Sequence, residues 1–271
     1  MEQTARPKAR RTYSRPPIAE RVGRVWAELS EESFLRNFET WRDKVQVEYP
    51  DYEPVKEWIV QVTERDGVPL YDTLQPELRL THRFARKAKG GQREFGMRCH
   101  NDGLALHLFT RPDVAHGYDA LAAEFMKWIP LWKSHFGAGP FNKALLHYSN
   151  LLNPETAGPF ITKHGGLELH KLLQSFLTVP GEHEAIIPPY DCTATVLLSK
   201  GPDLALTMRI YGDLETKPQP VVWVDFTVNV IPATGLETDD VMRFFDTAHE
   251  RILDRFDLVF TETAKRFFSG E

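Results

Sequence analysis

The side chains best suited to chemistry in this 271-residue chain lie at alternate positions of segments that have the pattern of β-strands. Alternate residues of a strand point to opposite faces of the sheet. One face is then apolar throughout, while the other concentrates arginine, histidine, aromatic and acidic residues. Arginine and aromatic side chains are enriched at recognition surfaces. We therefore predict a binding face whose main members are Arg98, His107, His147, Arg209, Trp223 and Asp225.

Two other interpretations of these residues stay open. In the plainer one the face is simply solvated, and Arg209 forms an ion pair with Asp225 across adjacent antiparallel strands. In the other, His107 or His147 is a general base that Asp225 orients, in a cleft between two halves of the molecule.

Motifs for nucleotide binding and nucleophilic catalysis do not occur in the sequence. It contains no G-x-x-x-x-G-K-[ST], no G-x-G-x-x-G after a strand and no G-x-S-x-G. His164 and His170 are six residues apart, a spacing that does not place two ligands on one helix face. Cys99 and Cys192 are the only cysteines, which excludes a disulfide framework and a cysteine-rich zinc site. We expect neither a metal nor a cofactor.

The elements that position the predicted face follow from hydrophobic periodicity and turn residues. Ser30 is expected to cap the first helix, with Leu35 in its apolar stripe, and Pro50 and Pro54 to end it. Pro130 is expected to kink or split the second. The first half contains a strand at 18–29, the helix after Ser30, strands at 58–62 and 78–86, a hairpin of 93–100 and 104–110 around Asn101-Asp102-Gly103, and a helix at 118–136 ended by Gly137.

The second half has the same order of elements. Its members are a strand at 143–150, a helix at 167–177, a hairpin of 193–199 and 204–211, a strand at 221–230 and a helix at 239–260. This order predicts a duplicated α+β fold, with two strand–helix–antiparallel strands–helix units, their sheets side by side and the helices on one face. The units would be 16–137 and 141–271, after a flexible basic tail at 1–15.

Composition limits the class of protein. With 42% hydrophobic and 26% charged residues, the chain is typical of a globular protein. No apolar run is long enough for a membrane span, and the basic start has no signal-peptide core, so we expect a cytoplasmic protein. The net charge is −5, but five basic residues against Glu2 give the first 15 residues +4 and leave −9 for the remainder. An acidic body argues against a large phosphate-binding surface.

Several short motifs, taken in order, resemble a sporadically distributed prokaryotic family of uncharacterised proteins. The motifs are Pro16-Pro17-Ile18-Ala19-Glu20, His147-Tyr148-Ser149-Asn150, the strand holding Asp225, and His249-Glu250-Arg251-Ile252 followed by Phe256 and Thr261-Glu262. The resemblance covers about residues 13–268. His147 stands where the family usually has arginine, and Thr227 where it often has a second acid. The resemblance implies a fold and a cytoplasmic origin but no reaction. The patchy distribution of the family is similar to that of accessory or defence loci.

The function expected from these observations is that of a non-enzymatic binding module. Its partner would be another protein or a ligand on the uncovered sheet face, and the oligomeric state is left open. The first alternative is a hydrolase-like enzyme that uses the histidine–aspartate general base. The second is nucleic-acid recognition through the basic tail, Arg98, Arg209 and Trp223, which the acidic body disfavours.

Overall fold

The computed structural model describes residues 13–60, 63–65, 68–70, 76–110, 117–161, 168–174, 191–197, 205–213 and 221–271. Its strands are β1 (Ile18–Trp26), β2 (Asp51–Val60), β3 (Thr63–Arg65), β4 (Val68–Leu70), β5 (Pro76–Lys87), β6 (Arg93–His100), β7 (Gly103–Phe109), β8 (Lys143–Leu152), β9 (Asp191–Leu197), β10 (Ala205–Asp213) and β11 (Val221–Val230). Its helices are α1 (Glu31–Gln46), α2 (Tyr118–Phe136), α3 (Pro154–Ala157), the 3₁₀ turn η2 (Gly158–Phe160), α4 (Leu169–Leu172), α5 (Thr238–Val259) and α6 (Glu262–Ser269). The expected mixture of helices and strands in an α+β fold is confirmed.

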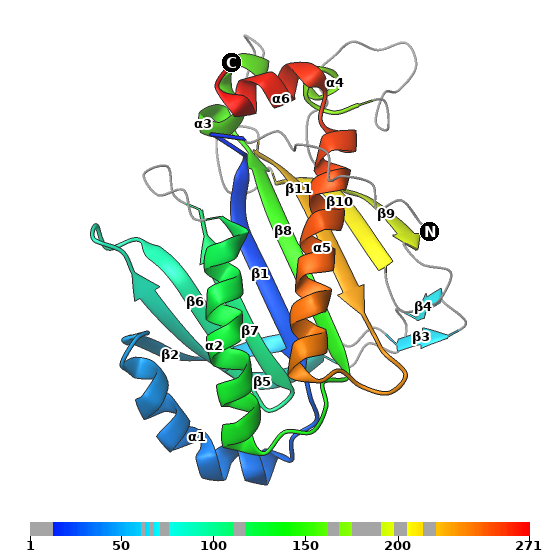
Figure 1. Cartoon of the computed structure of the whole chain (residues 1–271). Coiled ribbons are helices and arrows are strands. Elements are labelled where there is room, and N and C mark those ends of the chain that lie inside the picture. Colours follow the sequence, from blue (N-terminus) through cyan, green and yellow to red (C-terminus); the bar gives the residue numbers. More distant parts are fainter. Residues whose placement is uncertain are drawn as a thin grey trace, which may run out of the picture.

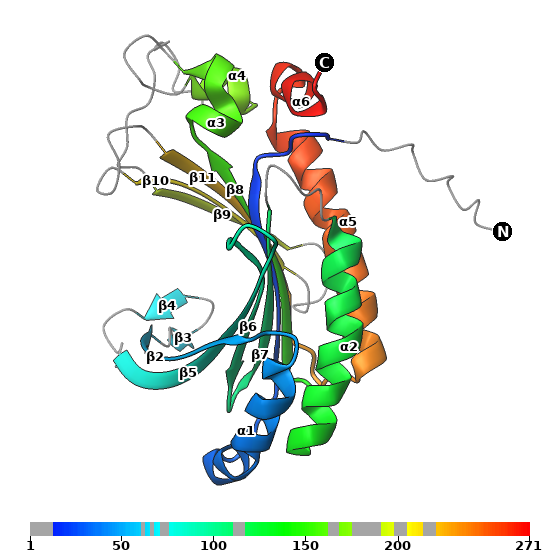
Figure 2. The same cartoon turned by 90° about the vertical axis from the view of Figure 1, so that its left-hand side faces the viewer.

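Nine of the described strands form one antiparallel sheet in the order β2-β5-β6-β7-β1-β8-β11-β10-β9 (Figure 1). The first strand of the chain is thus near the middle of the sheet, between β7 and β8. Figure 2 shows that the sheet curves away from α2 and α5, which lie together on its outer side. We call the side against α2 and α5 the helix face and the hollow side the concave face.

The helix face holds the core. The alternation predicted for it is confirmed wherever side chains are described, since Met97, Leu106, Val224 and Phe226 are all at most 1% exposed. Trp41 of α1, Trp128 of α2 and Phe245 of α5 pack in the same apolar cluster. The sheet and three helices are therefore held together mainly by burial of apolar and aromatic area, the dominant favourable contribution to folding.

Helix limits follow local capping, as the sequence predicted. The Ser30 hydroxyl accepts a hydrogen bond from the Ser33 backbone N–H at 3.1 Å and starts α1. Gly137 ends α2 with a φ of 64°, a left-handed conformation that glycine adopts without strain. Helix α6 was not predicted; it starts at Thr261, whose hydroxyl accepts from the Ala264 N–H at 3.2 Å.

Two local predictions are wrong, and of the kink or split predicted at Pro130 the split does not occur. Pro54 lies inside β2, which is longer than expected; β2 is at the edge of the sheet, where a residue without an N–H loses no ladder bond. Helix α2 continues through Pro130 as one element. Leu35, placed in the buried stripe of α1, is 55% exposed because the buried residues of that helix follow the spacing of Phe34 and Phe38 instead.

Gly103 is required by a close contact between strands rather than by the hairpin turn in which the sequence places it. It is the first residue of β7, and the two-residue turn before it is Asn101-Asp102. A β-carbon at Gly103 would lie 2.1 Å from the Val25 carbonyl oxygen of β1. Glycine is needed here because the neighbouring strand approaches too closely for any side chain.

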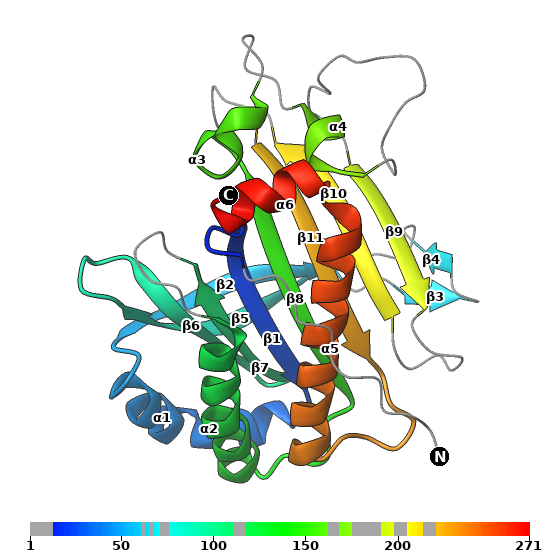
Figure 3. The ribbon, with the colours of Figure 1, turned by 45° about the horizontal axis from the view of Figure 1, so that its top comes forward.

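One end of the sheet is covered by α3, α4 and α6 (Figure 3). Residues 13–15 dock at this end: the Arg15 N–H donates to the Phe268 carbonyl at 2.8 Å, and the Tyr13 hydroxyl donates to Asp257 Oδ1 at 2.5 Å. The basic residues of 1–12 lie outside the described part of the chain. Of the helix predicted at 167–177, residues 169–172 are helical as α4, and 167 and 175–177 are not described.

Candidate binding face

Strand register brings the predicted histidines together on the concave face. Val22 of β1 pairs with His107 of β7 on one side and with His147 of β8 on the other, so both histidines lie in one row across three strands. In the neighbouring row Ser149 pairs with Glu20 and with Asp225. Four strands therefore contribute two histidines and two carboxylates to one small area.

The closest pair in this area joins His107 and Glu20. His107 Nδ1 lies 2.6 Å from Glu20 Oε1, and the imidazole is only 9% exposed. Burial lowers the pKa of His107. Burial alone raises the pKa of the Glu20 carboxyl, but the hydrogen bond from His107 and the charges of His107, His147 and Arg98 outweigh burial and bring the pKa below its ordinary value. A neutral imidazole therefore donates its Nδ1–H to an ionised carboxylate.

This assignment leaves His107 Nε2 as a hydrogen-bond acceptor. The atom is buried and has no hydrogen-bond partner among the described residues. Glu20 was not among the predicted site residues. The signal for Glu20 is that Glu20, Val22 and Arg24 alternate with Arg21, Gly23 and Val25 in the strand predicted at 18–29, which places Glu20 on one face with Arg24.

His147 and Asp225 are neighbours without a mutual hydrogen bond. His147 Nε2 is 3.9 Å from Asp225 Oδ2, and its Nδ1 lies 2.8 Å from the Thr227 hydroxyl. Asp225 instead accepts a hydrogen bond of 2.6 Å from the Ser149 hydroxyl. Burial is the main cause that lowers the pKa of His147. The carboxylate that orients a histidine here is thus Glu20 toward His107, and not Asp225.

Arginines of the concave face share a few carboxylates. Arg98 Nη1 lies 3.6 Å from Glu57 Oε1, and the same oxygen accepts from Arg83. The Arg98 side chain remains 45% exposed. One carboxylate thus faces two guanidinium groups. Burial acts to raise the pKa of Glu57, but hydrogen bonds from Arg83 and Thr81 and the charges of the two arginines lower it overall.

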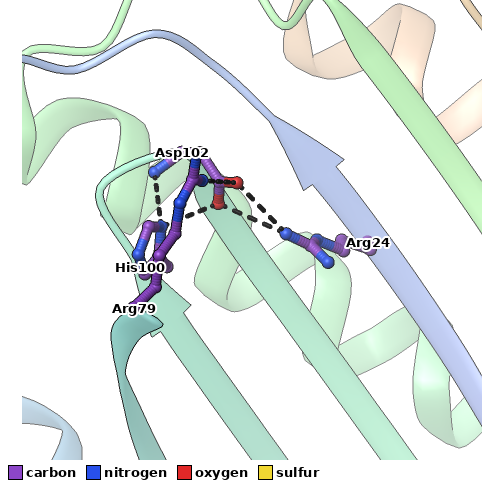
Figure 4. Close-up of polar contacts among 4 residues, drawn as sticks. All are labelled: Arg24, Arg79, His100 and Asp102. Atoms are coloured by element: carbon purple, nitrogen blue, oxygen red, sulfur yellow. Dashed lines mark hydrogen bonds and ion pairs between the residues drawn. The ribbon is translucent and has the colours of Figure 1, made fainter. Parts of the chain in front are cut away.

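A second cluster lies at the turn between β6 and β7. Asp102 accepts from Arg24 at 3.3 Å and from Arg79 at 3.2 Å, and its backbone N–H donates to His100 Nδ1 at 3.2 Å (Figure 4). Burial acts to raise the pKa of Asp102, but His100 and the two arginines lower it overall. Because these contacts join β1, β5 and the turn, we assign the cluster a structural role.

The remaining predicted residues are placed only in part. Arg209 pairs in register with Asp225, as expected, but the Arg209 side chain is outside the described part of the structure. Trp223 is half-buried on β11 between Leu151 and Tyr211 in register.

A cavity of about 460 Å³ opens beside His107 between β2, β5, β6 and β7. Its lining residues are Pro50, Asp51, Tyr52, Glu53, Arg83, Phe84, Ala85, Lys87, Arg93, Gly96, Met97, Arg98, His107 and Phe109. A second cavity, of about 550 Å³, adjoins the Asp102 cluster and the start of α1.

Within the described ranges, no three histidine, cysteine or acidic side chains are grouped so that they could hold a metal ion. His164 is not described, so the predicted absence of a metal site at His164 and His170 is untested. The helices in the described part include none that is both long enough and apolar enough to span a bilayer. Comparison of the chain with protein-family models, curated proteins and solved structures gives no match.

Proposed function

We propose that this protein is a binding module and that the concave face of its sheet receives the ligand or partner. The observation that carries the proposal is the cavity of about 460 Å³ on this face, next to the buried His107–Glu20 pair and the two arginines that share Glu57. Polar groups that are buried without full pairing cost stability. Such groups around a hollow are typical of sites whose remaining partners come from a ligand.

The test is a comparison of variants for retention of cellular components. Immobilised wild-type protein, Arg98→Ala and Trp223→Ala are exposed to extract, and bound proteins and small molecules are identified by mass spectrometry. We expect each variant to weaken binding of the specifically retained component by ~2 kcal/mol, which is about 30-fold in Kd. Arg36→Ala, on the exposed side of α1, is the control and should retain it. Equal retention by all four proteins would overturn the proposal.

A second candidate is an enzyme that uses acid–base catalysis. The specific observation in its favour is the 2.6 Å contact between His107 and Glu20, because a histidine oriented by a carboxylate is the usual arrangement of a general base. Turnover of the retained component, lost in His107→Gln, would distinguish this candidate from simple binding. The net charge of −9 outside the first 15 residues counts against nucleic-acid binding, since a nucleic-acid backbone needs several cations spread over a wide surface.

Two organisational features belong to the same proposal. We propose that 16–137 and 141–271 are repeated halves with their helices on one side; the adjacent central positions of β1 and β8, the first strands of the two halves, support this. We also propose cytoplasmic residence, which the buried free thiol of Cys99 supports.

A further inference from the structure

The cavity beside His107 has a floor of small residues. Ala85 of β5 pairs with Gly96 of β6, and Gly96 pairs with His107 of β7. A β-carbon at Gly96 would lie 3.3 Å from the Phe109 ring and 3.4 Å from His107 Cβ. The hollow therefore exists because two consecutive positions of one row carry almost no side chain.

The walls of the cavity carry an excess of positive charge. Four cationic side chains line it, Arg83, Arg98, Lys87 and Arg93, against the two acids Asp51 and Glu53. Lys87 lies 2.8 Å from Asp51, and Arg83 and Arg98 share Glu57. Arg83 Nε is buried and lacks a hydrogen-bond partner among the described residues. Guanidinium groups bind carboxylate and phosphate oxygens with particular strength.

The lining of the cavity also includes a group of the opposite polarity. His107 lines it with a side chain only 9% exposed, its Nδ1 engaged with Glu20 and its Nε2 left as an acceptor. A buried acceptor without a donor destabilises the protein, and a ligand O–H or N–H would supply the missing donor. The Phe109 ring lies nearly parallel to the imidazole, at 12° and 6.1 Å between centroids, and adds an apolar surface.

We infer that this cavity binds a small anion that places phosphate or carboxylate oxygens on Arg83 and Arg98 and donates an O–H or N–H to His107 Nε2. The volume of about 460 Å³ is within the ~300–1,000 Å³ usual for small-molecule sites. The inference rests on the proposed function, since it names the ligand chemistry of the same concave face. It also predicts a preference between anions: one that carries a proton should bind better than one of equal size and shape that does not.

Phosphate and sulfate test that preference directly, because only phosphate retains an O–H near neutral pH. Titration calorimetry at constant ionic strength, with phosphate, sulfate, glycerol 3-phosphate and citrate, separates the phosphoryl source from the carboxylate source. We expect one of the protonated or hydroxyl-bearing anions to bind at least tenfold more tightly than sulfate. Arg98→Ala should weaken binding of that anion at least tenfold, and His107→Phe, which keeps a ring but has no acceptor, should remove the anion's advantage over sulfate. Lys56→Ala, an exposed cation whose register partner is Leu80, should have no effect.

The outcomes separate this inference from the function on which it rests. Binding of no probe, failure of all three proton-donating anions to bind more tightly than sulfate, or unchanged binding by Arg98→Ala would each overturn the anion site. If the anion site fails while Arg98→Ala still loses the component retained from extract, the concave face binds a partner of other chemistry and only the inference is wrong. If the anion site fails and Arg98→Ala still retains the component from extract, the proposed function is wrong as well.

Discussion

The two faces of the sheet are built from alternate residues of the same strands, yet they use different physical interactions. On the helix face Trp41, Trp128 and Phe245 are at most 1% exposed and contact other aromatic rings. On the concave face the described interactions are mostly hydrogen bonds and ion pairs, such as His107 with Glu20 and Ser149 with Asp225. Under the proposed function, stability and recognition lie on opposite sides of the strands. Substitutions on the two faces should differ accordingly.

The largest effect is expected from removing an aromatic side chain on the helix face. Trp41 is fully buried and meets Trp128 edge-on at 5.8 Å between ring centroids. Trp41→Ala should lower the free energy of unfolding by ~3–5 kcal/mol through lost burial and a cavity. Urea denaturation measures the change. Leu35→Ala, on the exposed side of the same helix, is the control, and an equal loss in both variants would contradict the comparison.

A smaller loss is expected from adding one carbon to the helix face at Gly23. Its β-carbon would lie 1.8 Å from Phe125 Cζ of α2, so Gly23→Ala forces the helix or the ring to move, at a cost of ~3 kcal/mol. Phe125→Leu removes the ring atoms that collide. In a double-mutant cycle, Gly23→Ala should lower the free energy of unfolding by less in the Phe125→Leu background than in the wild-type background. Strict additivity of the two losses would show that the close approach of Gly23 and Phe125 does not limit packing.

Acid should destabilise the protein through buried histidines on both faces. Burial lowers the pKa of His82, which packs against Phe38 on the helix face, to about 4, and it also lowers those of His107 and His147. The unfolded chain takes up these protons near pH ~6.5, before the folded chain does. The contribution of these neutral histidines to the free energy of unfolding is therefore fully present above that pH, and it is lost as the pH drops from ~6.5 toward 4.

His82→Phe separates the part of this fall that belongs to the helix face. The fall in unfolding free energy between pH 7 and 5 should become smaller by on the order of 2 kcal/mol, as measured by urea denaturation at each pH. An unchanged pH profile would mean that the charged form of His82 is tolerated among the rings.

The smallest effect on stability is expected on the concave face. The ion pair of Arg98 with Glu57 is partly exposed, and such pairs contribute at most ~1 kcal/mol. Arg98→Ala should leave the urea midpoint nearly unchanged while it weakens ligand binding. A loss of stability as large as that of Trp41→Ala would make Arg98 a structural residue and remove the distinction between the faces.

Periodicity and capping predicted most of the fold because they are local. The limits of α2 match those expected from its apolar spacing and Gly137, and those of β11 match the alternation of its valines. Pro54 misled the prediction because the position of β2 at the sheet edge is a tertiary property. Strand parity placed the two histidines on the concave face, but it did not predict their hydrogen-bond partners. Whether Glu20 or Asp225 orients a histidine depends on which strands lie side by side.

The central position of β1 has a consequence for how the chain folds. Val22 pairs with His107 on one edge and with His147 on the other, so β1 finds its two neighbours only after long stretches of chain have followed it. Contacts of such large sequence separation slow folding. During synthesis, β1 is therefore a strand with both edges unpaired until β7 and then β8 leave the ribosome. Such unpaired edges are sites of misassembly.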